Sequence, residues 1–285
     1  MQLLLAKTAG FCFGVDRAVS LVEQTIREGK KAVTLGPIIH NRHVVAHFAA
    51  LGVREIASPD EAQAGETVIL RAHGVTQQMQ QALAAQGLDV VDATCPFVEK
   101  IHSIVRRATR EGRRCILIGS PEHPEVIAIA SFCRDPLIFR EGAELEKWLS
   151  EDAVRCNLPL TMICQTTGTQ KNWDFCREII KKRCTNCEIF DTICKATEMR
   201  QEEAIALSRK CDAMVVVGDA GSANTGRLAM ICKQYCRSVS LVDQADDLDL
   251  HLFSHASTIG ITAGASTPSW IIKEVNNTMS EELKV

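Results

Sequence analysis

Short apolar runs alternate with amphipathic segments along the whole chain. The runs are roughly four to seven residues long, and each leads into a turn rich in glycine and polar residues. The clearest runs cover residues 33–36, 68–70, 115–118, 160–163, 214–217 and 258–261. The segments between them have helical spacing, as in Val15, Ala18, Val19, Val22 and Ile26. This alternation predicts parallel α/β units, whose functional sites lie beyond the carboxyl ends of the strands.

A second pattern, a cysteine between a strand-like run and a helix, also recurs along the chain. Asp92-Ala93-Thr94-Cys95 and Asp191-Thr192-Ile193-Cys194 both end a strand-like run and precede a helix, and Cys12 holds the same position near the start. The repeat divides the chain into three predicted α/β modules, residues 1–94, 95–191 and 192–285. Each module also has two strand ends that carry polar side chains: His40 and His73, then His123 and Thr166, then Ser222 with Asn224 and Ser266. We expect three similar modules that converge on one site.

The composition of the chain excludes several classes of function. The chain has 285 residues, of which 46% are hydrophobic, and its net charge of −3 comes without a basic stripe. Nine Phe, three Trp and one Tyr give no aromatic platform, so nucleic-acid binding is excluded. No run approaches the ~20 apolar residues that span a bilayer, and the N-terminus shows no targeting pattern. We expect a cytosolic protein that holds any anionic ligand locally, through histidines, hydroxyls and backbone amides.

The cysteine count of thirteen is high and odd, which argues against a disulfide framework. Most of these residues are expected to be small buried hydrophobes. Cys12, Cys95 and Cys194 differ because each precedes a helix, and Pro96 suits a first helical position. A helix N-terminus favours the thiolate form, and three thiolates are one fewer than the usual four of a [4Fe–4S] cluster. The iron without a protein ligand would be open to a substrate oxygen; the alternative is three ordinary buried cysteines.

The polar strand ends suit a diphosphate. Histidines, small hydroxyls, an amide and free N–H groups at helix N-termini bind phosphate without a large positive field. Taken singly, each such residue is more often a helix cap or a satisfied core group. Glu125, which follows His123-Pro124, is a candidate proton donor because a closed site can raise a carboxyl pKa toward neutrality. Its alternative role is to complement the dipole of a helix.

Two other motifs have weaker claims. Cys184-Thr185-Asn186-Cys187 is a C-x-x-C, but its flanks are polar and basic and no second pair follows at matching spacing. His40, His43 and His47 have the spacing of metal ligands on one helical face. For His43 and His47 we favour an exposed or core-edge position.

Several motifs together resemble the 4-hydroxy-3-methylbut-2-enyl diphosphate reductase family, in order from about residue 1 to about residue 275. They are Gly10-Phe11-Cys12 with Gly14-Val15-Asp16-Arg17-Ala18, His40-Asn41-Arg42, Ala72-His73-Gly74-Val75, Asp92-Ala93-Thr94-Cys95-Pro96, His123-Pro124-Glu125-Val126, Gln165-Thr166-Thr167, Cys194-Lys195-Ala196-Thr197 with Arg200-Gln201, and Thr262-Ala263-Gly264-Ala265-Ser266. The sequence departs from the family pattern at Ala223, where a second serine is usual, and at Glu122 and Ala128, where glycine is usual.

The resemblance implies a pseudo-threefold trefoil of parallel-sheet α/β modules around one central [4Fe–4S] cluster. It assigns the cluster ligands to Cys12, Cys95 and Cys194 and a proton relay to Glu125. It places a further set of residues on the substrate: His40, His73, His123, Thr166, Ser222, Asn224 and Ser266. The missing serine at Ala223 removes one possible hydroxyl contact to the diphosphate.

The implied reaction is a reductive dehydroxylation of 4-hydroxy-3-methylbut-2-enyl diphosphate to isopentenyl and dimethylallyl diphosphate, the last step of the non-mevalonate route to isoprenoid precursors. An external one-electron donor, a ferredoxin or flavodoxin, is expected because no G-x-G-x-x-G opens a helix after the first strand. A quinolinate synthase-like dehydratase is one alternative, but it would bind carboxylates, and the chain has no clustered arginines for them. A non-catalytic iron–sulfur sensor is the other, and it would need neither Glu125 nor a phosphate cradle.

Overall fold

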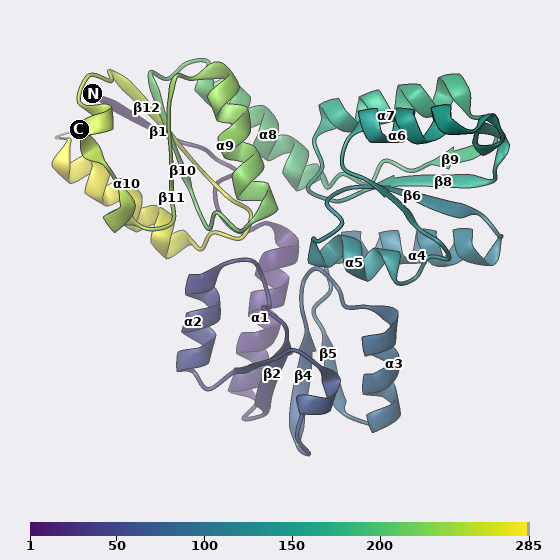
Figure 1. Ribbon diagram of the computed structural model, residues 1–285. Helices are drawn as coiled ribbons and strands as arrows, with labels where there is room; N and C mark the ends of the chain where they lie inside the picture. The colour runs from purple at the N-terminus through teal and green to yellow at the C-terminus, as the bar shows by residue number, and fades with distance from the viewer. Residues whose placement is uncertain (284–285) are drawn as a thin grey trace. The chain divides into compact units, whose positions relative to one another are not determined.

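The computed structural model describes residues 1–283, and its strands form three parallel sheets. Each sheet has four strands (Figure 1). The first sheet has the order β3 (Arg54–Ile56), β2 (Lys31–Leu35), β4 (Glu66–Leu70), β5 (Asp89–Asp92). The second has the order β7 (Leu137–Phe139), β6 (Arg114–Ile118), β8 (Leu160–Cys164), β9 (Cys187–Ile189). The third has the order β11 (Ser238–Val242), β10 (Ala213–Val217), β12 (Thr258–Ala263), β1 (Gln2–Leu5).

Helices connect the strands, as parallel pairing requires. They are α1 (Phe13–Arg27), α2 (Arg42–Ala50), α3 (Gln77–Gln86), α4 (Pro96–Arg110), α5 (Pro124–Ala130), α6 (Gly142–Glu151), α7 (Gln170–Arg183), α8 (Lys195–Ser208), α9 (Ala223–Tyr235) and α10 (Ser269–Glu282). Short 3₁₀ turns lie at η1 (Pro59–Glu61), η2 (Ala153–Asn157), η3 (Ala245–Asp247) and η4 (Leu250–Phe253). The predicted parallel α/β class is confirmed.

The three sheets repeat one topology, with a single break in chain order. In each sheet the strand that precedes a candidate cysteine lies at the edge: β5 before Cys95, β9 before Cys194 and β1 before Cys12. For the third sheet this edge strand comes from the opposite end of the chain, because Gln2 pairs with Thr258 and Leu5 with Ile261. The division into residues 1–94, 95–191 and 192–285 therefore assigned β1 to the wrong sheet. The error is a long-range pairing that no local pattern encodes.

The described chain forms two compact units. Unit 1 comprises residues 1–16, 39–51 and the chain from Lys195 onward, and it contains the third sheet. Unit 2 comprises residues 17–38 and 52–194, and it contains the first and second sheets. The segment that carries His40 and α2 thus groups with the third sheet, although the sequence division placed it in the first module.

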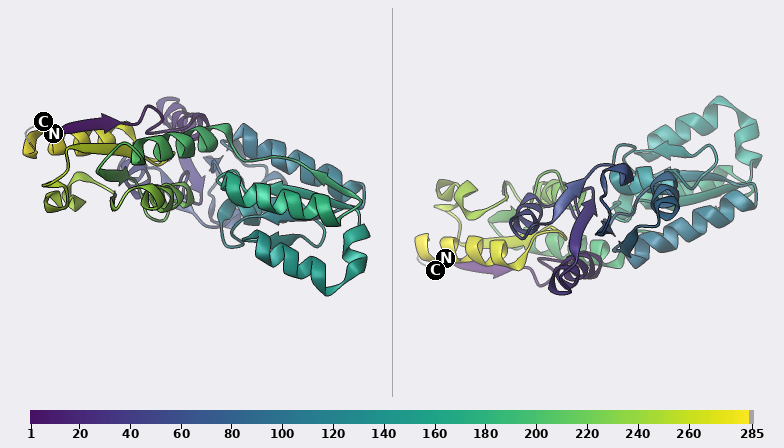
Figure 2. Two further views of the ribbon diagram at one scale, coloured as in Figure 1. Left: turned by 90° about the horizontal axis from the view of Figure 1, so that it is seen from above. Right: turned by 90° about the horizontal axis from the view of Figure 1, so that it is seen from below.

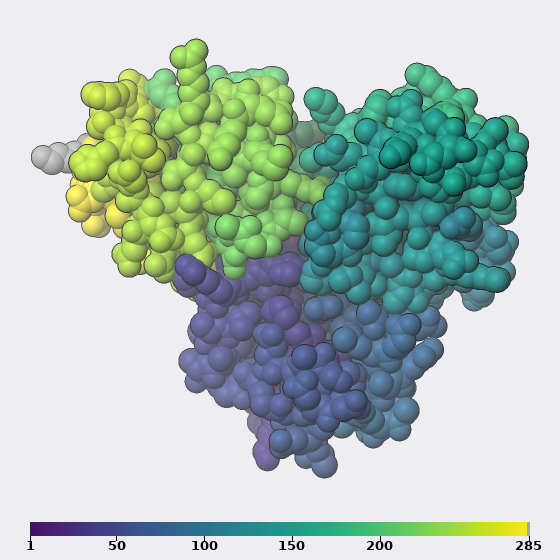
Figure 3. All heavy atoms as spheres, in the orientation of Figure 1, coloured from purple at the N-terminus to yellow at the C-terminus, as the bar shows by residue number. Residues whose placement is uncertain are grey.

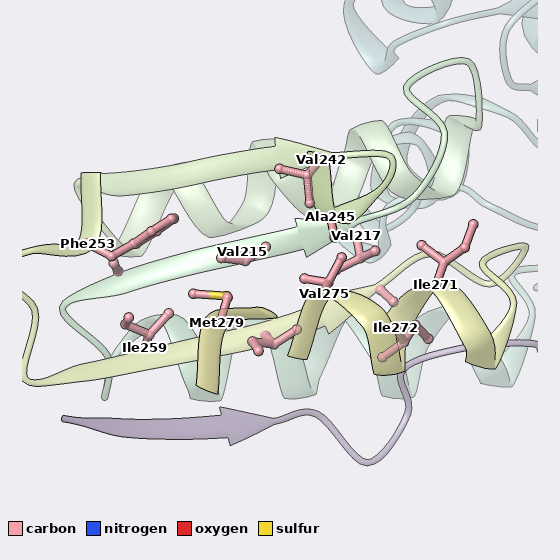
Figure 4. Packing of buried hydrophobic residues seen from close by; sticks show 13 residues of the cluster. Val215, Val217, Val242, Ala245, Phe253, Ile259, Ile271, Ile272, Val275 and Met279 are labelled. Carbon is pink, nitrogen blue, oxygen red and sulfur yellow. The ribbon is translucent and has the colours of Figure 1, made fainter. Parts of the chain in front are cut away.

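Strands in the middle of the sheets are buried on both faces, which explains their continuous apolar runs. In β10, Val215 and Val217 pack with α10, while Met214 and Val216 face the core formed with α8 and α9. Figure 4 shows Val275 and Met279 of α10 against this sheet. Leu3 of β1 joins the same core, and Figure 2 shows β1 running alongside α10.

The second sheet is covered in the same way. Ile116 and Ile118 of β6 pack against α6 and α7, while Cys115 and Leu117 face α4 and α5. The result is an apolar interior with polar groups at the strand ends.

Figure 3 shows residues 195–283, coloured green to yellow, packed together, with apolar cores on both faces of the third sheet.

Among the described residues no helix combines the length and the apolar character needed to cross a membrane. The cytosolic location stays a prediction.

Candidate active site

The three predicted ligand cysteines occupy equivalent backbone positions. Each stands directly before a helix, since α1, α4 and α8 begin at Phe13, Pro96 and Lys195. Each donates its backbone N–H to the carbonyl of the second residue beyond the strand next to it: Cys12 to Ala265 at 3.1 Å, Cys95 to Ala72 at 2.9 Å and Cys194 to Thr166 at 3.0 Å. All three cysteines are half-buried. The sequence repeat is therefore a repeat of local structure.

A second position is also repeated, five residues beyond the middle strands β2, β6 and β10. It is occupied by His40, His123 and Ser222. Before it, a glycine N–H bonds to the carbonyl that ends the neighbouring edge strand: Gly36 to Ile56 at 2.7 Å, Gly119 to Phe139 at 2.9 Å and Gly218 to Val242 at 2.8 Å. The same position beyond the strand thus carries a different functional side chain in each sheet.

In unit 2, Glu125 lies within a tight polar arrangement at the ends of β6 and β8. His123 caps α5, and its Nδ1 accepts the Glu125 N–H at 3.2 Å. The Glu125 side chain is 1% exposed, and it accepts the Thr166 N–H at 2.7 Å and the Thr166 hydroxyl at 2.6 Å. Two hydrogen bonds from one residue fix both carboxyl oxygens. Glu125 is thus a held, buried acid, and its place in the first turn of α5 is only part of its environment.

His73 lies beside His123 in the same unit. Their ring centroids are 5.6 Å apart in an edge-to-face arrangement. The next residue, Gly74, has a φ of +76°, and a Cβ there would come within 2.7 Å of Cε1 of His102 on α4. Burial lowers the pKa of His102, which Glu99 partly opposes.

In unit 1, hydroxyl and amide groups gather at the ends of β10 and β12. The Ser266 hydroxyl donates to the His40 carbonyl at 2.9 Å and lies 3.4 Å from the Ser222 hydroxyl. Ser222 caps α9 by accepting the Thr225 N–H at 3.5 Å. Asn224 is 5% exposed, and within residues 1–283 neither its Oδ1 nor its Nδ2 has a hydrogen-bond partner. A buried amide in that state is suited to a polar ligand, because leaving it unpaired costs free energy.

The segment after His40 is fastened to the third sheet by charged groups that the sequence reasoning did not identify. Asn41 caps α2 by accepting the His43 and Val44 N–H groups, both at 3.1 Å. Asp243 lies against the Arg42 guanidinium and 3.2 Å from His43 Nε2. Asp219 accepts the Arg42 N–H at 3.1 Å. His43 Nε2 therefore lies beside the Arg42–Asp243 ion pair. The signal in the sequence was an aspartate soon after each of two strands, Asp219 after β10 and Asp243 after β11.

The C-x-x-C motif lies away from the strand-end turns. Cys184 caps the C-terminus of α7, and Cys187 begins β9. Burial raises the pKa of Cys184 to about 11 and that of Cys187 to about 12. Both thiols are then protonated at neutral pH, which disfavours them as metal ligands.

Counting from the strand ends also identifies a residue that the sequence analysis did not select. Thr167 stands three residues beyond β8, as His73 does beyond β4 and Ser266 beyond β12. Its hydroxyl accepts from Gln165 Nε2 at 2.8 Å, and Gln165 Oε1 accepts the Ser120 N–H at 3.1 Å. Thr166, which was selected, contributes its side chain to Glu125 and its carbonyl to Cys194.

The sequence is similar to that of known proteins along nearly its whole length. The sequence matches the LytB protein family over residues 3–280. A protein of Thermoanaerobacter sp. (strain X514), named 4-hydroxy-3-methylbut-2-enyl diphosphate reductase, is 38% identical over 279 residues, which cover 96% of this chain and 95% of that protein.

Two solved structures are also similar. One, of (E)-4-hydroxy-3-methyl-but-2-enyl diphosphate reductase, is described as the terminal enzyme of the non-mevalonate pathway. It is 36% identical and gives a TM-score of 0.71 over 99% of this chain and all of that one. The other, an E-1-hydroxy-2-methyl-but-2-enyl-4-diphosphate reductase from Plasmodium falciparum, is 28% identical and gives a TM-score of 0.89 over 98% of this chain and 88% of that one. By this match along nearly its whole length, the chain belongs to the LytB protein family.

Proposed function

We propose that the chain is a 4-hydroxy-3-methylbut-2-enyl diphosphate reductase. It removes the hydroxyl of the allylic substrate as water, using two electrons and two protons, and gives isopentenyl and dimethylallyl diphosphate. The observation that carries the proposal is that each of the three sheets has a cysteine directly before a helix and polar side chains just beyond its strands. These residues stand in the motifs that resemble the family. The substrate is inferred from membership of the family.

Cys12, Cys95 and Cys194 are the proposed ligands of an iron–sulfur cluster. The donor set fits, because three half-buried cysteines each stand directly before a helix, where the thiolate form is favoured. The backbone N–H of each is already bonded, so the residue is held before any metal binds. When bound, a [4Fe–4S] cluster with three protein ligands supplies electrons one at a time and an iron with an open position.

The substrate diphosphate is assigned to the hydroxyl and amide groups of unit 1, together with the histidines. Ser222, Asn224 and Ser266 can offer donors to phosphate oxygens, and the N-terminus of α9 adds unpaired N–H groups and a favourable dipole. In unit 2, His73 and His123 supply imidazole donors beside one another. Neutral or weakly charged donors of this kind select a diphosphate by geometry.

Glu125 is proposed to deliver a proton to the departing hydroxyl. Its carboxyl is almost fully buried and both oxygens are held by Thr166, so its orientation is fixed before the reaction. A positioned carboxylic acid contributes roughly 10²–10⁴ to a proton-transfer rate. Thr166 then has a role through Glu125, because it restricts the carboxyl to one rotamer.

The electron donor is proposed to be a separate protein, a ferredoxin or a flavodoxin. The chain lacks the glycine fingerprint that would hold a nicotinamide dinucleotide, so electrons must arrive from outside.

An anaerobic assay tests the function directly. Purified protein with reconstituted iron and sulfide is mixed with reduced viologen and 4-hydroxy-3-methylbut-2-enyl diphosphate, and viologen oxidation and the products are followed. We expect consumption of two electrons per substrate and formation of both five-carbon diphosphates. A cluster-loaded protein that leaves the substrate intact while viologen stays reduced would overturn the proposal and favour a sensor. Consumption of quinolinate precursors without net electrons would favour the dehydratase alternative.

A further inference from the structure

Two charged side chains of α8 hold the loop that precedes Cys12. Arg200 is 3% exposed and donates to the Ala263 carbonyl at 2.7 Å and to the Gly10 carbonyl at 2.9 Å. Glu203, one turn further on, accepts the N–H groups of Lys7 and Thr8, both at 2.8 Å. The guanidinium therefore binds the end of the loop and the carboxylate binds its start.

The chemistry of the pair suits backbone recognition. A guanidinium is a planar fork that can bridge two carbonyls, whereas an ammonium is a point charge on a flexible stem. Burial acts to raise the pKa of Glu203, but the Thr8 hydroxyl and the Thr8 and Lys7 amides hold it below its usual value. Gly10 has a φ of +107°, which glycine adopts readily and a residue with a side chain rarely does, so this point of the loop requires glycine.

A second arginine makes the same kind of contact at Cys95. Arg17 of α1 donates to the Thr94 carbonyl at 3.2 Å and to the Asp92 carbonyl at 3.1 Å. Thr94 is the residue directly before Cys95. The two cases follow one rule: the helix that begins after one cysteine carries an arginine that holds the backbone before another.

The loop before Cys194 is held differently. The fifth residue after Cys95, which corresponds to Arg17 after Cys12, is Lys100 and not an arginine. Arg107, later on α4, donates to the Glu188 side chain at 3.0 Å. Here the Thr192 hydroxyl donates to the Cys164 carbonyl at 2.5 Å and accepts the Cys164 N–H at 2.8 Å. Two of the three cysteine loops thus depend on an arginine, and the third on a threonine.

We propose that Arg17 and Arg200 are positioning residues that preorganise Cys95 and Cys12 as ligands. The inference rests on the proposed function only in taking these cysteines as cluster ligands. Outer residues that orient a ligand typically change metal affinity or activity by about 10–100-fold when they are replaced. Because each arginine stands on the helix that follows another cysteine, the loops of successive ligands are also linked through the helices.

The test compares Arg200→Lys and Arg17→Lys with two control variants of neighbouring arginines. Arg209→Lys follows α8 and removes only a guanidinium that stacks on Tyr235 at 4.7 Å. Arg27→Lys lies at the exposed end of α1. Two readouts are used: amide hydrogen exchange in protein free of iron, and the rate of iron loss to a chelator after anaerobic loading.

We expect exchange in residues 7–12 to rise about tenfold or more in Arg200→Lys, and exchange in residues 92–95 to rise in Arg17→Lys. Iron loss should accelerate about 10–100-fold in both, and neither control should differ from the wild type. Folded variants with wild-type exchange and iron retention would overturn the proposal, and a lower melting temperature without these changes would do the same. If Arg200→Lys does not fold, Glu203→Gln and Arg17→Lys carry the comparison. A wild-type chain that binds no iron would contradict the proposed function, while the exchange measurement would still decide the arginine roles.

Discussion

The turn after β6 and the turn after β10 share a pattern of backbone hydrogen bonds but carry different functional groups. In both, a glycine N–H bonds to the end of the edge strand and the fifth residue caps the next helix. The cap is His123 in one and Ser222 in the other. The residue two positions later is Glu125 in one and Asn224 in the other, both nearly fully buried.

The difference lies in how the two buried side chains are satisfied. Both oxygens of Glu125 are bonded to Thr166, so this residue is fixed within its own unit. The amide of Asn224 has no hydrogen-bond partner among residues 1–283, so its groups are available to a ligand. One turn holds a carboxyl group in a single orientation, and the other leaves a buried amide without a partner among residues 1–283. In the proposed function, the first turn delivers a proton and the second binds the substrate.

The largest effect should come from the three cysteines, which occupy the same position in all three sheets. Replacing Cys12, Cys95 or Cys194 by Ser should abolish both cluster and activity, because a hydroxyl is a poor substitute for a thiolate. Iron analysis of anaerobic protein should fall from about four per chain in the wild type to a small fraction of that. Cys184→Ser and Cys187→Ser are the matched controls and should retain both. Loss of the cluster in a control, with retention in one of the three, would refute the assignment.

Glu125→Gln removes the titratable proton from the turn that follows β6. We expect kcat to fall by about 10²–10⁴-fold with cluster content unchanged, and kcat/KM to fall with it. Gln can keep the Thr166 N–H bond through its oxygen, and the Thr166 hydroxyl can rotate to accept from the amide. Glu122→Gln is the control, since Glu122 is exposed and forms a salt bridge with Arg140 at 2.7 Å. Near-normal kcat in fully loaded Glu125→Gln would eliminate the proton-relay role.

Asn224→Ala tests the second turn. We expect KM to rise by about 10–100-fold, equivalent to a hydrogen bond of ~1.5–3 kcal/mol to a charged group, with a smaller change in kcat. Thermal stability should not fall, because the free protein loses no hydrogen bond with this side chain. Asn277→Ala on the exposed face of α10 is the control. A large loss of stability with an unchanged KM would mean that Asn224 is a structural residue, and the contrast with Glu125 would disappear.

The smallest effect should come from Ala223→Ser, which restores the serine usual in the family at the first position of α9. If its hydroxyl reaches the diphosphate, substrate binding should tighten by about 0.5–1.5 kcal/mol. KM and direct binding to cluster-loaded protein measure this. An unchanged KM in an intact protein would show that the turn after β10 already satisfies that phosphate oxygen.

The order of residues was enough to predict the buried middle strands and the polar groups in the turns that follow them. It did not reveal the edge strands β3, β7 and β11. Strands such as β10 are buried on both faces, so their apolar runs are continuous and easy to locate. The cysteines stand directly before helices, a relation that depends only on neighbouring residues. The sequence also indicated Glu125 and its histidine neighbour, because both lie in one turn.

The segments that meet at each turn became known from the folded chain alone. The pairing of β1 with β12 joins residues over 250 positions apart. The contact of Glu125 with Thr166 joins the turns after two strands, and that of Arg200 with Gly10 joins a helix to a loop. A side chain that bonds to a backbone carbonyl or N–H group places no requirement on the type of residue there, since nearly every residue has the same backbone groups. Such a contact therefore cannot be recognised from the sequence. Apolar periodicity can therefore be read along a chain, whereas the partner of a buried charge is known only after the chain has folded.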